Sequence, residues 1–104
     1  MQVIFGRETA EQIRERYTVL ELETFHAHGK EIPAFCVIPN EKIPINDLAR
    51  LEELTALHQD FIDSFNAENY ENCKNLYFQL HGQWKGELDS FYETIFNKVN
   101  SRTT

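Results

Sequence analysis

The sequence lacks several features that mark particular classes of protein. Its 104 residues include two cysteines, three prolines and four glycines. Two cysteines are too few for the disulfide framework of a small secreted domain. No apolar run approaches the length of a membrane span, and the opening MQVIFGRE has no stretch typical of a signal peptide. We therefore expect no membrane-spanning segment and a reducing, cytoplasmic setting.

Basic residues are also scarce. The chain carries 10 Lys and Arg against 17 Asp and Glu, which gives a formal net charge of −7. Most of the excess lies in residues 31–104, with six basic and twelve acidic residues. A surface that follows nucleic-acid phosphates needs clustered Lys and Arg. Because the sequence shows no such cluster, it disfavours nucleic-acid binding as the main function.

The glycines are isolated from one another, so there is no phosphate-binding loop. The most tempting pair of metal ligands is His26 and His28. If the two lie on a strand, both rings point to one face, where Glu23 or Glu31 could complete a zinc site. Zinc needs three or four convergent ligands and only two histidines are local, so a polar hairpin tip is the competing interpretation. No cofactor is predicted.

The other candidate catalytic residues have structural interpretations. Apolar neighbours surround Cys36, and burial raises a thiol pKa and makes it inert; Cys73 is also predicted to be a small buried hydrophobe. His58 falls on the apolar stripe of a helix, as a hydrogen-bonded core residue would, and His81 near a helix end complements the dipole. Because no set of residues meets the criteria for an active site, an enzyme is not supported.

The first forty residues predict the order β-α-β-β. Residues 2–5 are a short apolar, β-prone run, and residues 7–17 have apolar residues at helical spacing. Thr9 with Gln12 three residues later could form a capping box. In residues 18–25 apolar and acidic side chains alternate, as in a half-buried strand. Together with the run that follows, these segments predict one small sheet.

A β-hairpin is the predicted centre of this sheet. Residues 26–31 form a plausible turn, because Gly29 can adopt a positive φ. Residues 32–39 are a second β-prone run that contains Pro33. Proline cannot donate a hydrogen bond to a ladder, so Pro33 predicts a strand start or an edge strand.

The rest of the chain predicts three consecutive amphipathic helices after a linker-like segment, residues 40–47. Asn46 or Asp47 can cap the first helix, and Asn69 can cap the second. The predicted apolar stripes are Leu48, Leu51, Leu54, His58, Phe61 and Phe65; then Tyr70, Cys73, Tyr77, Leu80 and Trp84; then Leu88, Phe91, Tyr92, Ile95, Phe96 and Val99.

These elements predict an α+β fold, with a small antiparallel sheet followed by three helices packed on it. The β-containing half would span residues 1–40 and the helical half residues 41–104. Neither half is large enough to fold alone, so we expect one domain over residues 1–104.

The stretch LHQDFIDSFNAENYENCKNLYFQL resembles one tetratricopeptide-type helix pair. Phe65, Tyr70, Cys73 and Tyr77 occupy places where that pattern has aromatic or small residues. Phe61 departs from it, because the pattern has a small residue there. Only one copy is present, whereas stable arrays need about three. The resemblance implies shared packing geometry, and we do not infer a peptide-binding solenoid.

A second resemblance covers nearly the whole chain. The chain resembles small uncharacterised proteins of tailed marine bacteriophages in the order of four motifs. These are IFGRETAEQIRERYTVLELETF, then CVIP, then LHQ with a later Tyr and Cys, and then WKGELDSFY. This resemblance implies a phage origin and a host-cytoplasmic setting. It implies no activity and no site residues.

The helical half holds more aromatic residues than one small core face can take. Tyr77 and Phe78 are consecutive and diverge by about 100° around a helix, as do Phe91 and Tyr92. Because an exposed aromatic surplus indicates a contact surface, we predict Phe78, Trp84 and Tyr92 as interaction residues, with Tyr77 anchoring the core. Coverage of the second face by the β half is the competing interpretation.

The function predicted from the sequence is therefore that of a small acidic cytoplasmic interaction protein. Its partner would be another protein or, most simply, a second copy in a homodimer. The alternative is a small metal-binding protein or enzyme that uses His26 and His28.

Overall fold

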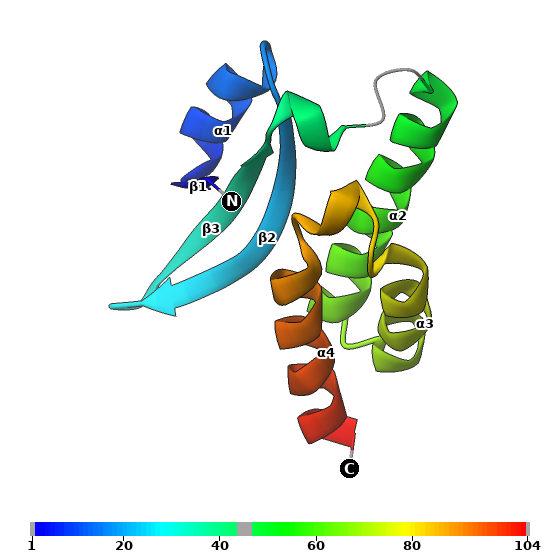
Figure 1. Cartoon of the computed structure of the whole chain (residues 1–104). Coiled ribbons are helices and arrows are strands. Elements are labelled where there is room, and N and C mark those ends of the chain that lie inside the picture. Colours follow the sequence, from blue (N-terminus) through cyan, green and yellow to red (C-terminus); the bar gives the residue numbers. More distant parts are fainter. Residues whose placement is uncertain (1, 44–46, 104) are drawn as a thin grey trace. The chain divides into compact units, whose positions relative to one another are not determined.

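The computed structural model describes residues 2–43 and 47–103 (Figure 1). The chain divides into two compact units, Met1–Asn40 and Glu41–Thr104, and each is described by itself. In its described part the chain has a three-stranded antiparallel sheet and four α-helices, which confirms the predicted α+β class. The packing of three helices on the sheet stays a prediction.

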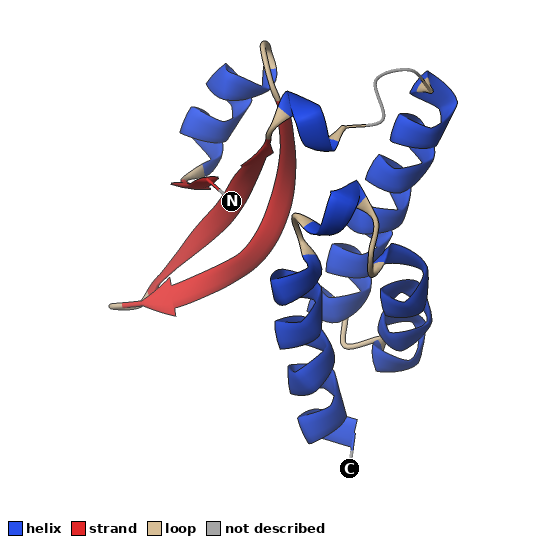
Figure 2. Ribbon diagram, viewed as in Figure 1, coloured by secondary structure: helices blue, strands red, loops and turns tan. Residues whose placement is uncertain are grey.

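The Met1–Asn40 unit has the predicted order β-α-β-β. Its elements are β1 (Gln2–Phe5), α1 (Arg7–Arg14), β2 (Thr18–Ala27) and β3 (Lys30–Ile38). The strand order is β1-β3-β2, and both neighbouring pairs are antiparallel (Figure 2). The helix and one sheet face share a small core of Ala10, Val19 and Phe35, flanked by Ile13 and Val37.

The predicted capping box of α1 is wrong. The helix begins at Arg7, directly after the strand, so Thr9 lies inside it and no side chain caps it. Gly6 makes the abrupt change from strand to helix possible because its φ is +95°, a region that glycine enters without steric cost. The helix ends at Arg14, which leaves Tyr17 outside it and half exposed.

Pro33 lies in the central strand of the sheet, so its predicted place at a sheet edge is wrong. Along its length β1 pairs with Ala34 and the residues after it, and Gly6 N donates to Pro33 O (2.9 Å) where β1 ends. The N and C=O of a strand residue point to the same side. The missing donor of Pro33 therefore faces the place where the β1 ladder stops. Nearby, β2 has a bulge that sets Leu22 and Glu23 opposite Ala34.

The Glu41–Thr104 unit contains the predicted three helices, α2 (Leu48–Asn66), α3 (Tyr70–Leu80) and α4 (Asp89–Thr103). Two short 3-10 turns, η1 (Asn40–Lys42) and η2 (Trp84–Gly86), also occur, with η1 at the junction of the units. Asp47 Oδ1 accepts from Arg50 N (3.0 Å), and Asn69 Oδ1 accepts from Asn72 N (3.4 Å). Both caps are confirmed, and the alternative cap Asn46 lies outside the described residues.

The core of this unit lies between α2 and α4, with α3 packed on both helices. Phe61 and Tyr92 meet edge to face with ring centroids 5.3 Å apart, and both are fully buried. His58 Nδ1 and Tyr92 Oη lie 2.8 Å apart in a hydrogen bond, which confirms His58 as a bonded core residue. Leu48 was predicted on the apolar stripe but is 68% exposed, because the first turn of α2 extends beyond this core.

Candidate interaction surface on α3 and α4

The two predicted metal ligands do not share a strand face. Lys30 pairs with Ala27, which leaves His28 and Gly29 as a two-residue hairpin turn with φ of +52° and +73°. Both residues being left-handed is the geometry of a type I′ turn. His26 lies on β2 opposite Glu31. Within residues 2–43 and 47–103 no three His, Cys, Asp or Glu side chains converge as a metal site.

The two thiols are buried and unoxidised, as the sequence predicts. Cys36 is enclosed in the central strand, and Cys73 Sγ lies 3.9 Å from the carbonyl oxygen of Phe61. Burial raises the pKa of Cys73 to about 11. At neutral pH such a thiol is protonated, so Cys73 is a packing residue and a poor nucleophile.

Two of the three predicted surface residues are in fact core residues. Trp84 is 2% exposed and Tyr92 is fully buried, so both predictions are wrong. The hydrogen bond to His58 holds Tyr92 inward, and Phe91 takes the half-buried position beside it. Trp84 is buried from the η2 turn, whose backbone leaves the helical path.

Phe78 is the predicted surface residue that the structure leaves on the surface. It is 70% exposed, more than any other large apolar side chain in the described part of the chain. On the same helix Cys73, Leu76 and Leu80 are buried. Leu76 and Leu80 each stand two positions from Phe78, about 200° away around the helix, so burying them points Phe78 outward. The core residues of α3 are thus Cys73, Leu76 and Leu80, and the prediction that Tyr77 anchors the core is wrong.

Phe78 belongs to a cluster of three rings, here called the α3–α4 aromatic surface, made of Tyr77, Phe78 and Phe96. Tyr77 and Phe96 are half buried and stack with centroids 4.2 Å apart and an interplanar angle of 17°. Phe78 meets the edge of each, at 5.3 Å from Tyr77 and 5.6 Å from Phe96. The stacked pair forms a platform, and the third ring lies steeply tilted against it, at 75° to Tyr77 and 73° to Phe96.

Polar groups border this platform. His81 lies 5.3 Å from the Tyr77 ring, and its Nε2 is 3.1 Å from Glu93 Oε1 and 3.9 Å from Asp89 Oδ2. Partial burial raises the pKa of Tyr77, and the negative charges of Glu93 and Asp89 raise it further. An apolar centre with a charged border is the usual composition of a protein interface.

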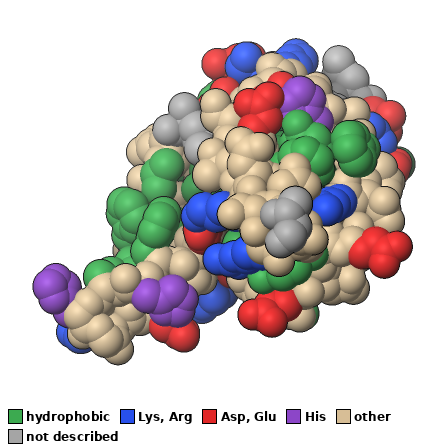
Figure 3. All heavy atoms as spheres, turned by 90° about the horizontal axis from the view of Figure 1, so that it is seen from below, with side chains coloured by type: hydrophobic (Ala, Val, Ile, Leu, Met, Phe, Trp, Pro, Cys, Tyr) green, Lys and Arg blue, Asp and Glu red, His purple; other side chains and the backbone are tan. Residues whose placement is uncertain are grey.

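Exposed hydrophobic side chains gather in patches on the face shown in Figure 3 instead of lying singly. A second exposed ring pair is Phe5 and Phe25 in the Met1–Asn40 unit, with centroids 6.2 Å apart. Within the described ranges, no helix combines the length and apolar character needed to span a bilayer.

The sequence indicates Phe78 but neither of its ring partners as surface residues. Tyr77 and Phe96 were both assigned to apolar stripes, because each recurs at helical spacing with true core residues. A usable signal is present in the consecutive pair at 77 and 78, since adjacent residues on a helix point about 100° apart, so a narrow core face favours only one of them. Phe96 joins them only through the packing of α4 beside α3.

Comparison with known proteins finds no matching family model, no matching curated protein and no matching solved structure.

Proposed function

We propose that this chain is a small acidic protein-interaction protein that self-associates through the α3–α4 aromatic surface. The observation that carries the proposal is the 70% exposure of Phe78 above a stacked ring pair. Burying a Phe side chain is worth about 1.5–3 kcal/mol. A partner that covers this ring recovers that free energy at little ordering cost, because the platform beneath it is already packed.

A second copy is the simplest occupant. In a two-fold dimer the same patch faces itself, so each exposed ring meets the platform of the other copy. Aromatic pairs across such a contact add about 0.5–1.5 kcal/mol beyond the buried area. The net charge of −7 on each copy opposes the approach. Salt screens this repulsion and therefore strengthens the dimer.

The test is sedimentation or light scattering of the purified chain at micromolar concentrations, in low and in moderate salt. We expect a reversible dimer that tightens with salt. Phe78→Ser should be monomeric, whereas Phe25→Ser should still form the dimer, since Phe25 is an exposed ring (48%) that lies on the β-hairpin. Melting curves of both variants check that each is folded.

A wild-type chain that is monomeric at every salt concentration overturns the proposal. Equal loss of association in Phe25→Ser and Phe78→Ser moves the interface off the α3–α4 aromatic surface. The cytoplasmic setting and the phage-type origin belong to this proposal on the strength of the sequence pattern, as does the tetratricopeptide-type packing of α2 and α3.

A further inference from the structure

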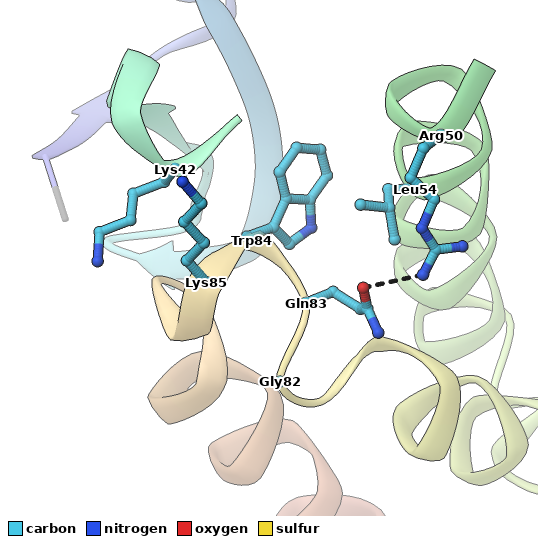
Figure 4. A pocket seen from close by; sticks show the side chains of 7 residues that line it. All are labelled: Lys42, Arg50, Leu54, Gly82, Gln83, Trp84 and Lys85. Atoms are coloured by element: carbon cyan, nitrogen blue, oxygen red, sulfur yellow. Dashed lines mark hydrogen bonds between the residues drawn. The ribbon is translucent and has the colours of Figure 1, made fainter. Parts of the chain in front are cut away.

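The Glu41–Thr104 unit has a cavity of about 220 Å³ between the start of α2 and the turn that follows α3 (Figure 4). This volume lies below the usual 300–1,000 Å³ of drug-sized pockets, so it suits a ligand of few heavy atoms. The residues that line it are Lys42, Arg50, Leu54, Gly82, Gln83, Trp84 and Lys85.

Trp84 presents a buried donor that has no acceptor. Its side chain is 2% exposed, and its Nε1 has no hydrogen-bond partner among the described residues. Leaving a buried donor unsatisfied costs about 1–3 kcal/mol. In Figure 4 the indole nitrogen faces the side of the cavity where Leu54, Gln83 and Arg50 lie. Because an indole N–H can only donate, a molecule that satisfies it must bring an acceptor.

The charges that line the cavity are all positive. Lys42, Arg50 and Lys85 contribute three cations and no lining residue is acidic, although the chain as a whole is acidic. Arg50 is held in place, with Nη2 donating to Gln83 Oε1 (2.9 Å) and Nη1 to Glu53 Oε1 (3.0 Å). The pair with Glu53 offsets part of its charge. Lys42 and Lys85 make no hydrogen bond or ion pair within residues 2–43 and 47–103.

The amide of Gln83 is oriented by Arg50. Since Gln83 Oε1 accepts from the guanidinium, its Nε2 points away from Arg50 (Figure 4). The two lysines lie on the other side of the Trp84 ring in this view. Donors from Trp84 and Arg50 thus lie on one side of the cavity, and two ammonium groups supply further positive charge nearby.

The backbone that places Trp84 is strained. Trp84, Lys85 and Gly86 have φ of +54°, +51° and +83° in succession, a short left-handed turn. Such a conformation costs a non-glycine residue about 1–2 kcal/mol. The turn is closed by Gly86 N donating to Gln83 O (3.0 Å) and Glu87 N donating to Trp84 O (3.1 Å). Strain of this kind, held by its surroundings, is concentrated at ligand sites.

From the buried donor, the positive lining and the strained turn together, we propose that this cavity binds a small organic oxyanion. The ligand would carry a carboxylate or phosphate group that accepts from Trp84 Nε1 and pairs with Arg50. Lys42 and Lys85 would add attraction at longer range. The cavity is too small for a nucleotide or a polymer. This site is independent of the α3–α4 aromatic surface.

Trp84 is the only tryptophan, so its indole ¹H–¹⁵N resonance reports on the site alone. The chain is titrated with succinate, with glycerol 3-phosphate and with uncharged glycerol at constant ionic strength. We expect a saturable shift of the indole resonance with one or both anions and none with glycerol. The two anions distinguish a carboxylate ligand from a phosphate ligand.

The variant Arg50→Gln should weaken binding by about tenfold or more, the effect of losing one charged hydrogen bond. Lys30→Ala removes an equal charge from the β-hairpin and should leave binding unchanged. The proposal is overturned if neither anion moves the indole resonance, if glycerol moves it equally, or if both variants weaken binding to the same extent. A thermal shift that follows the same order among the ligands checks the result without the indole signal.

Discussion

The two units of this chain are built in different ways. In Met1–Asn40 the main interactions are backbone hydrogen bonds between strands, because three strands pair along most of their length and the core shared with α1 is small. In Glu41–Thr104 side chains decide the structure, through buried rings and the His58–Tyr92 hydrogen bond. The first unit has one exposed ring pair, Phe5 and Phe25, whereas the three-ring cluster with the most exposed ring and the unsatisfied buried donor lie in the second unit.

This difference is informative about where function resides. In the sheet unit the central strand β3 is paired on both sides, and only the edge strands β1 and β2 leave one side of the ladder open. The helical unit keeps features that cost free energy, namely the exposure of Phe78, the orphaned Nε1 of Trp84 and the left-handed turn. Departures of this kind from local consistency are concentrated at functional sites.

The largest expected effect is on the free energy of unfolding, and it is tested by removing one core ring from each unit. Phe61→Ala should lower the free energy of unfolding by about 3–5 kcal/mol, because it empties a fully buried site against Tyr92. Phe35→Ala should cost a similar amount in the sheet unit, where the same cavity penalty applies. Urea unfolding followed by far-UV circular dichroism and Trp84 fluorescence measures both.

If the chain is one domain, the two signals give a single coincident transition for the wild type and for each variant. Two separate transitions, with each variant moving only one of them, would contradict the prediction of a single domain.

A smaller effect concerns the pH dependence that the helical unit owes to Cys73. Its pKa is raised from 9.0 to about 11 by burial, so the folded state favours the protonated thiol. The stability that Cys73 contributes in this way is fully present below pH 9, the pKa of the thiol in the unfolded chain. It is lost as pH rises through about 11, the pKa in the folded state. At pH 10 the unfolded chain has lost most of this proton, and linkage predicts a loss of about 1 kcal/mol of stability.

The measurement is urea unfolding of the wild type and Cys73→Ala at pH 8 and pH 10. The variant is less stable at both values, and the gap between the two proteins should narrow at pH 10. An unchanged gap would show that Cys73 does not titrate differently on folding.

The smallest expected effect is on stability, and it is tested at the N-terminal ends of α2 and α1. Asp47→Ala should destabilise the chain by about 1 kcal/mol, because the side chain caps α2. Thr9→Ala should change stability by less than about 0.5 kcal/mol, since Thr9 is exposed within α1 and caps nothing. Thermal unfolding of the two variants measures the contrast. If Thr9→Ala lost more stability than Asp47→Ala, the result would support the capping box at Thr9 and contradict the structure.

Much of the fold is predictable because it depends on neighbours in the sequence. Strands 2–5 and 32–39 follow from β-prone runs and strand 18–25 from a period-two pattern, and the caps at Asp47 and Asn69 follow from local side-chain chemistry. Burial of Cys36 follows from its apolar neighbours, and burial of Cys73 from its place on the apolar stripe of a helix. The α+β class and the element order therefore come from local signals.

Predictions from the sequence are wrong where two local patterns compete, or where a segment distant in the sequence determines the local structure. Thr9 has the residue pattern of a cap, yet the helix starts two residues earlier because β1 ends at Phe5. Pro33 suggests an edge strand, yet it is tolerated in the central strand because β1 ends beside it. For the candidate surface the sequence offers consecutive rings, and only packing chooses which of them faces outward.

Periodicity and capping chemistry in the sequence thus determine which segments become helix or strand, since these act over a few residues. The sequence already indicates Phe78 as a surface residue, whereas only tertiary structure decides that Trp84 and Tyr92 are buried. It does so because each helix has one face to bury, and the neighbouring helices and the left-handed turn select that face. The α3–α4 aromatic surface and the cationic cavity are consequences of that selection.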